Sequence, residues 1–207
     1  MKAIYLVLLP SLWLLSILTN QNEKNKPEIA ESRLNRSNAV NTDIQTGADQ
    51  TGKYVPWLKG KKVGMTINPS SLIGDRMSVD SLISSGVNVV KGFGPEHSFR
   101  GGREGAIPDG IDEKTGIPII SLYNGKGKYK PAKEDLAGID IMIFDMQETG
   151  VRFYTRLAIF QYVMEACAEN NIEMIVLDRP NPNSYFVDGP ILEEKFKSIV
   201  GMNPIPI

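Results

Sequence analysis

Asp140-Ile141-Met142-Ile143-Phe144-Asp145 is the stretch that decides the fold of this chain. Its four central residues are apolar without interruption, which is typical of a strand buried on both faces of a parallel sheet. Such a strand needs helices packed on each of its two faces. We therefore expect an α/β domain around this stretch.

Strand-like and helix-like segments alternate on both sides of it. Short apolar or β-branched runs indicate strands, and apolar residues spaced at three to four indicate helices. This alternation predicts a Rossmann-like three-layer domain with a mostly parallel sheet of five strands. The expected strands are 62–68, 87–91, 117–122, 140–145 and 173–177, and the expected helices are 77–85, 131–136 and 153–170.

The beginning of the chain has a different character. Met1 and Lys2 precede an apolar run that ends near Leu18, and this pattern predicts an export signal or a membrane anchor over residues 1–19. Residues 20–52 are polar, and their composition is typical of a disordered tether. The folded domain is expected over residues 53–207.

Composition excludes several kinds of function. The formal net charge is −1, so nucleic-acid binding is not expected. Cys167 is the only cysteine; we expect it to fill the core, and without a Cys/His cluster we expect no metal. Asn68-Pro69-Ser70-Ser71 follows the first strand where a dinucleotide-binding turn would need glycines, and no Walker A sequence occurs. We expect no cofactor.

The loop after the second strand reads Gly94-Pro95-Glu96-His97-Ser98-Phe99-Arg100-Gly101-Gly102 and holds the only histidine. Glu96 is the strongest candidate for a catalytic carboxyl group, and His97 is a candidate acid or base. The alternatives are a salt bridge between Glu96 and Arg100 and a loop-stabilising hydrogen bond from His97.

Polar side chains follow all five predicted strands. Ligands of open α/β sheets bind beyond the carboxyl ends of the strands, so these side chains should line a site, with Asp145 a second catalytic candidate. We expect Arg152 and Arg179 to pair with a substrate carboxylate, or else with Asp145 and Asp178. Tyr154 could stack on a sugar ring or lie at the edge of the core. The substrate-binding candidates are Asn68, Arg100, Tyr123, Gln147, Arg152, Tyr154, Asp178 and Arg179.

Several motifs together resemble a bacterial family labelled DUF1343. The loop with Glu96 resembles its PEHGFRG signature, with Ser98 in place of the usual glycine. The other similar stretches, in the same order as in the family, are Thr115-Gly116-Ile117-Pro118, Ser121-Leu122-Tyr123, Phe144 to Thr155, Leu177 to Pro182 and Asp188-Gly189-Pro190.

The resemblance implies an exported exo-β-N-acetylmuramidase, which releases N-acetylmuramic acid from the non-reducing ends of peptidoglycan fragments during cell-wall turnover or recycling. It implies Glu96 as the leading catalytic carboxylate, with His97, Arg100, Asp145, Arg152, Tyr154 and Asp178 lining the site. The expected partner is a muropeptide or muramyl sugar, and the N-terminus is a possible membrane tether. The family continues into a second domain, so the 207 residues correspond to its N-terminal part, which could be inactive alone.

Glycoside hydrolysis usually employs two carboxyl groups, and their separation sets the stereochemistry. Asp145, Glu148, Asp178 and the acetamido group of the substrate itself are alternatives for the second group. The rival functions are a non-catalytic module that binds cell-wall sugars and, less favoured, an esterase or amidase, for which no G-x-S-x-G motif is present.

Overall fold

The structure is a computed structural model that describes residues 44–102 and 105–207. The predicted export segment at 1–19 and most of the predicted tether lie outside the described residues. Gln45 to Ile207 form one compact unit. Within the described residues, no helix combines the length and the apolar character that a membrane crossing requires.

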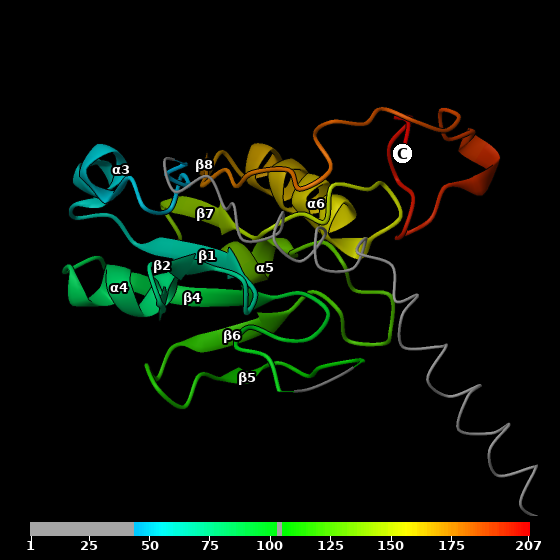
Figure 1. Cartoon of the computed structure of the whole chain (residues 1–207). Helices are drawn as coiled ribbons and strands as arrows, with labels where there is room; N and C mark the ends of the chain where they lie inside the picture. Colours follow the sequence, from blue (N-terminus) through cyan, green and yellow to red (C-terminus); the bar gives the residue numbers. More distant parts are fainter. Residues whose placement is uncertain (1–43, 103–104) are drawn as a thin grey trace, which may run out of the picture. The chain divides into compact units, whose positions relative to one another are not determined.

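A six-stranded sheet forms the centre of this unit (Figure 1). The strand order is β5-β6-β4-β1-β7-β8, and every neighbouring pair is parallel except β5 and β6. The α/β fold and the five predicted strands are confirmed. The strands are β1 (Val63–Ile67), β4 (Val89–Gly94), β5 (Gly110–Ile111), β6 (Pro118–Ser121), β7 (Ile141–Asp145) and β8 (Glu173–Val176).

The sixth strand, β5, was not predicted. It has two residues, Gly110 and Ile111, and pairs antiparallel with β6 at the edge of the sheet. A strand this short carries no alternation of apolar and polar residues, so the sequence gives no period to detect. A two-stranded antiparallel sheet of β2 (Leu72–Ile73) and β3 (Arg76–Met77) was missed for the same reason.

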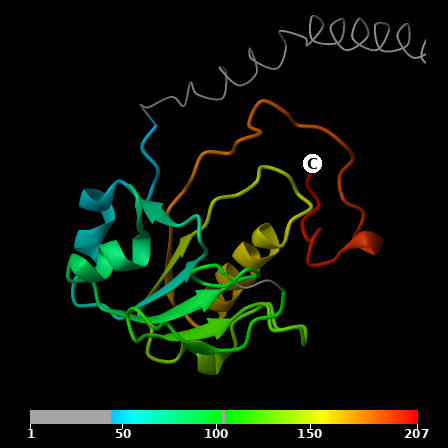
Figure 2. The same cartoon turned by 60° about the horizontal axis from the view of Figure 1, so that its bottom comes forward.

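Helices cover both faces of the sheet (Figures 1 and 2). Ile141 and Ile143 of β7 join an apolar cluster with side chains of α3 and α4, whereas Met142 and Phe144 join a second cluster with side chains of α5 and α6. This division follows from the alternation of side chains along a strand. The helices are α3 (Thr51–Leu58), α4 (Ser78–Ser84), α5 (Lys133–Leu136), α6 (Thr155–Glu169) and the short 3-10 helix η1 (Glu194–Phe196).

The boundary between tether and domain was predicted too late in the chain. Ala48 is fully buried, the Gly47 N–H donates to the Asp178 carbonyl at 2.7 Å, and the Tyr54 hydroxyl donates to the Ala48 carbonyl at 3.0 Å. The segment from Gln45 therefore belongs to the folded unit. It was missed because α3 contains a glycine and Pro56, both poor helix formers, and because Gly47 and Ala48 are too small to give an apolar pattern.

Cys167 is buried in the second cluster, as predicted. Burial raises the pKa of its thiol to about 11, so the reactive thiolate is scarce at neutral pH. Cys167 is core filler rather than a nucleophile.

Candidate active site

The carboxyl ends of the parallel strands bring the predicted site residues to one edge of the sheet. Thr66 of β1 is in register with Phe93 of β4, and Ile67 is in register with Asp145 of β7. Residues that follow β4 and β7 therefore emerge side by side. The prediction that Glu96 and Asp145 share this edge is confirmed.

The loop after β4 has a left-handed backbone at two consecutive residues that are not glycine. The φ angles are 66° at His97 and 70° at Ser98. Such positions cost about 1–3 kcal/mol each and persist only where their surroundings hold them. The Ser98 hydroxyl provides part of that support, because it accepts from the Gly101 N–H at 2.9 Å and donates to the Gly101 carbonyl at 3.0 Å.

Glu96 lies half-buried between this loop and the start of α6. The Thr155 hydroxyl, on the first residue of α6, donates to Glu96 Oε2 at 3.3 Å. Tyr154, at the N-cap position, makes no side-chain cap hydrogen bond. A carboxylate next to a helix N-terminus interacts favourably with the helix dipole. The N-terminus of α6 therefore favours this position of the Glu96 carboxylate, while part of the side chain remains exposed.

Two further groups stand beside Glu96. The negative charge of its carboxylate raises the pKa of Tyr123, which follows β6. His97 is exposed, and no described side chain or backbone group forms a hydrogen bond with its ring. The alternative in which His97 stabilises the loop through its ring has no contact to support it. Glu96, His97 and Tyr123 are the site candidates that the structure leaves accessible and close together.

Arg100, predicted to bind substrate, is paired with two carboxylates of the protein, and it also lines a cavity beside the loop after β4. Its Nε and Nη2 donate to the carboxylate of Asp112 at 2.5 and 2.8 Å, and its Nη1 and Nη2 donate to that of Asp80 at 3.1 and 2.8 Å. Four of its five N–H donors are occupied. The predicted alternative of a Glu96–Arg100 salt bridge is also absent among the described residues.

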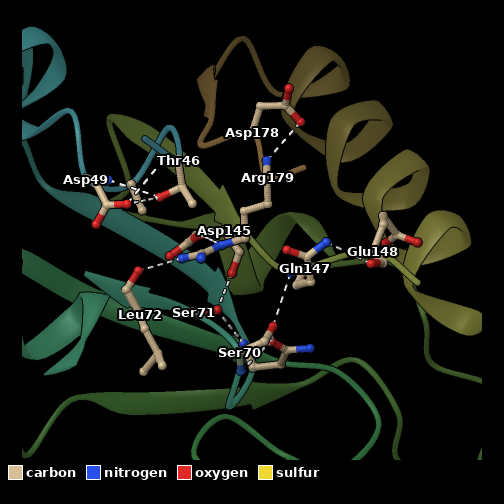
Figure 3. A network of polar contacts seen from close by, with 12 residues as sticks. Thr46, Asp49, Ser70, Ser71, Leu72, Asp145, Gln147, Glu148, Asp178 and Arg179 are labelled. Atoms are coloured by element: carbon tan, nitrogen blue, oxygen red, sulfur yellow. Dashed lines mark hydrogen bonds and ion pairs between the residues drawn. The ribbon is translucent and has the colours of Figure 1, made fainter. Parts of the chain in front are cut away.

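Asp145 is completely buried, although it was predicted to be catalytic (Figure 3). Arg179 Nε donates to Asp145 Oδ1 at 2.7 Å, and Arg179 Nη2 donates to the Leu72 carbonyl at 2.8 Å. The Ser71 hydroxyl donates to the backbone carbonyl of Asp145. The alternative reading, in which Arg179 pairs with Asp145, is therefore correct. This geometry assigns both residues to holding the strand ends together rather than to chemistry.

Asn68 and Gln147 are also occupied by loop contacts, and Figure 3 shows the contact between Gln147 and Ser70. Asn68 Oδ1 accepts from the Ser70 N–H at 3.0 Å, and the Ser70 hydroxyl in turn accepts from the Gln147 N–H at 3.1 Å. Gln147 Nε2 donates to the carbonyls of Glu148 and Pro180 at 2.8 and 2.7 Å. These bonds tie the loops after β1, β7 and β8 into one frame.

Arg152 and Tyr154 differ in their availability. Arg152 Nη1 donates to the carbonyls of Pro190, at 2.7 Å, and Ile205, so the guanidinium holds the C-terminal stretch. Tyr154 is 45% exposed and stacks on Phe153 with ring centroids 5.7 Å apart. The core-edge alternative for Tyr154 is thus disfavoured, and its ring is free to meet a ligand. Asp178 is exposed and accepts a hydrogen bond from the Arg179 N–H at 2.9 Å.

Glu148, predicted only as one alternative for the second catalytic carboxyl group, lies in a distinctive environment. It lines a cavity of about 200 Å³ together with Asp178 and Arg179 and six apolar residues, and its Oε1 is buried without a hydrogen-bond partner. Burial raises the pKa of Glu148. Its place directly after Gln147, past a buried strand, was the signal that could have ranked it higher.

A larger cavity of about 510 Å³ adjoins the loop after β4. Gly94, Ser98 and Asp109 are among its lining residues, as is Ser121 at the end of β6. In the part of the chain that the structure describes, no group of three or more His, Cys, Asp or Glu side chains could hold a metal ion. Arg100, Asp112 and Lys114 also line this cavity, whereas Glu96, His97 and Tyr123 do not.

The sequence of this unit matches a family profile described as "Exo-beta-N-acetylmuramidase NamZ, N-terminal" over residues 63–207. The chain belongs to this family. The match covers the whole sheet and the loops at its carboxyl edge.

Relatives of the NamZ N-terminal family extend the comparison. The chain is 45% identical over 170 residues to the peptidoglycan beta-N-acetylmuramidase NamZ of Bacillus subtilis (strain 168), covering 79% of this chain and 41% of the relative. It also resembles crystal structures of two DUF1343 family proteins from Bacteroides fragilis NCTC 9343. One has a TM-score of 0.70 and 43% identity, covering 80% of this chain and 43% of that one. The other has a TM-score of 0.71 and 37% identity, covering 78% and 41%.

The chain spans about two fifths of the length of these relatives. Its departure from the family signature at Ser98 falls on a left-handed residue, where glycine carries no steric cost. The two hydrogen bonds of the Ser98 hydroxyl with Gly101 offset part of that cost.

Proposed function

We propose that this chain forms the Glu96 side of the active site of an exo-acting glycoside hydrolase that releases N-acetylmuramic acid from the non-reducing ends of peptidoglycan fragments. The observation that carries the proposal is the placement of Glu96. It is a partly exposed carboxyl group at the carboxyl edge of the sheet, beside Tyr123 and the N-terminus of α6. The family to which the chain belongs bears the name of this activity.

Glu96 supplies the proton in the proposed mechanism. Cleavage of a glycosidic bond needs a carboxylic acid that protonates the leaving oxygen while positive charge develops on the sugar ring. No described cation pairs with Glu96, and its described neighbours are the hydroxyl groups of Thr155 and Tyr123. In this proposal the exposed side chains of His97 and Tyr154 contact the sugar.

Asp145 is a poor choice for the second group, because it is buried and paired with Arg179. Glu148 and Asp178, which share the smaller cavity, and the acetamido group of the substrate are the alternatives that fit the geometry. We include the part of the relative that this chain does not cover as a further proposed source of the second group.

The biological setting follows from the substrate. Peptidoglycan lies outside the cytoplasmic membrane, so we place the protein in the periplasm or outside the cell, with residues 1–19 as its export signal or anchor. Its role there would be cell-wall turnover or recycling.

A chromogenic β-glycoside of N-acetylmuramic acid tests the proposal. It is incubated with the 207-residue chain and, in parallel, with this chain followed by the C-terminal portion of the Bacillus subtilis relative. Glu96→Gln should lower kcat by about 10²–10⁴-fold, because the amide keeps the shape but delivers no proton. Glu134→Gln, the same change on the exposed surface of α5, serves as the matched control and should have no effect.

The result also separates the rival functions. Binding of the sugar without turnover in both proteins would favour a non-catalytic sugar-binding module. Turnover that survives in Glu96→Gln at more than about a tenth of the original rate would reject Glu96 as the acid.

A further inference from the structure

Arg100 links the loop that carries Glu96 to two other parts of the fold. Asp80 lies in the first turn of α4, and Asp112 directly follows β5. Both carboxylates are nearly buried, and each receives two hydrogen bonds from the Arg100 guanidinium. The planar fork of arginine matches carboxylate geometry in a way that a lysine ammonium does not.

The two carboxylates are themselves held in place. Asp112 Oδ2 also accepts from the N–H and the hydroxyl of Thr115 at 3.1 and 2.5 Å, and the Asp112 carbonyl accepts from the Gly116 N–H at 2.7 Å. Asp80 accepts from Lys114 Nζ at 2.6 Å, but the Lys114 side chain is 61% exposed. The turn before β6 therefore offers Arg100 a rigid partner.

The neighbour of Arg100 in the loop is fixed as well. Phe99 is buried, and its ring occupies the space above Gly92, where an added Cβ would lie 2.6 Å from the ring. Phe99 and Arg100 thus anchor the loop on the C-terminal side of the two left-handed residues, and Pro95, buried at the end of β4, anchors the other side. Strained backbone of this kind persists where its flanks are fixed.

We propose that Arg100 is a positioning residue, which fixes Glu96 and His97 in the site by pairing with Asp80 and Asp112 and does not bind the substrate. Loss of this pairing releases the loop, the left-handed residues relax, and Glu96 leaves its place beside Thr155. The expected effect of Arg100 on turnover rests on the proposed function. The expected effect of Arg100 on the conformation of the loop does not depend on that function.

His97 gives a direct reading of the loop, because it is the only histidine in the chain. Its imidazole resonances in a two-dimensional NMR spectrum of the untagged 207-residue protein report the environment one residue from Glu96, with no substrate present. Arg100→Lys and Asp112→Asn should both shift these resonances. Lys114→Gln, which removes another cation from the same Asp80, should leave them in place.

Kinetics give the second readout. Misplacement of a catalytic group by about 1 Å can cost about 10²-fold in rate, so Arg100→Lys should lower kcat by at least about tenfold with KM changed less than about threefold. A rise in KM at unchanged kcat, with the His97 resonances unmoved, would show that Arg100 binds the substrate and would overturn the inference.

Asp112→Asn covers the case in which Arg100→Lys does not fold. It keeps the shape of the side chain and the hydrogen bonds from Thr115 while removing the charge that pairs with Arg100. Unchanged His97 resonances in a folded Asp112→Asn protein would also overturn the inference. If neither the unmodified protein nor its extended form turns over the substrate, the proposed function fails. The NMR comparison still decides the role of Arg100 in that case.

Discussion

The chain leaves β4 and β7 at the same edge of the sheet, and a carboxyl group predicted from the sequence to be catalytic lies at each of these two places. Asp145 is the last residue of β7, is completely buried and is paired with Arg179. Glu96 lies two residues beyond the end of β4, past Pro95, and is partly exposed with one hydrogen bond from Thr155. A carboxyl group still on the strand is part of the frame, whereas one placed further along the loop can face a ligand.

Alternation along the strand explains the fate of Asp145. Ile141 and Ile143 point into the cluster covered by α3 and α4, and Asp145, two residues further on, points to the same face. The buried side chain then requires a partner of opposite charge. Arg179, from the loop after β8, supplies it.

The largest expected effect follows from removing that partner. Arg179→Ala leaves the Asp145 carboxylate buried without its cation, and breaking such a pair costs about 3–5 kcal/mol of the free energy of unfolding. Urea unfolding followed by circular dichroism measures this loss. Asp178→Asn, at an exposed site next in the chain, should change the free energy of unfolding by less than about 0.5 kcal/mol. Equally small changes in the free energy of unfolding for both variants would contradict the assignment of Arg179 and Asp145 to the structural frame.

The Arg100 pairs predict a smaller effect that depends on pH. Hydrogen bonds from Arg100 and Lys114 lower the pKa of Asp80, and the pKa of Asp112 is lowered as well, because hydrogen bonds from Arg100 and Thr115 outweigh its burial. A carboxyl group with a lowered pKa in the folded protein stabilises the fold above its unfolded pKa, and that stability is lost as the pH falls through the folded pKa.

Asp80→Asn should therefore destabilise the protein by about 1–3 kcal/mol at pH 6. The difference from the unmodified protein should shrink as the pH falls below the ordinary aspartate value of 3.8. Urea unfolding at a series of pH values between 6 and 2.5 measures both free energies. A difference that stays constant over this range would contradict the assignment of Asp80 to the ion pair.

Replacing Glu148 should stabilise the protein at neutral pH, by a smaller amount than the loss expected for Asp80→Asn. Burial raises its pKa, so the folded protein is penalised as the pH rises from the ordinary glutamate value of 4.5 through the raised pKa. Glu148→Gln removes the charge and should raise Tm at pH 7 by about 2 °C, with a smaller gain at pH 4. Differential scanning calorimetry at the two pH values checks this. A lower Tm at pH 7 would mean that the carboxylate has a stabilising partner.

The sequence was informative about elements and their order, and less so about the direction of side chains. Apolar runs such as Ile141 to Phe144 predicted the parallel strands, and the topology then placed Glu96 and Asp145 at one edge. The ion pair between Arg100 and Asp80 joins residues 20 positions apart, and no local sequence pattern predicts it. The same holds for Arg179 and Asp145, which are 34 positions apart. Long-range pairs of this kind decide which charges are free for a ligand.

The segment before α3 shows a second limit. Gly47 and Ala48 can pack closely against the domain because their side chains are small. An added Cβ on Gly47 would lie 2.6 Å from the Asp178 nitrogen, and Ala48 is fully buried. Small residues in a polar stretch are also typical of a tether, so composition alone points the wrong way here.

The account is tested most directly by measuring both activity and Tm for Glu96→Gln and Asp145→Asn, on the chain extended by the C-terminal portion of the Bacillus subtilis relative. Glu96→Gln should lose about 10²–10⁴-fold in kcat on the muramic acid glycoside with Tm changed by less than about 2 °C. Asp145→Asn should lower Tm by at least about 4 °C and, below the new transition, keep kcat within about fivefold. The reverse pattern, with an active Glu96→Gln and a stable but inactive Asp145→Asn, would contradict the assignment of Glu96 to the chemistry and of Asp145 to the frame.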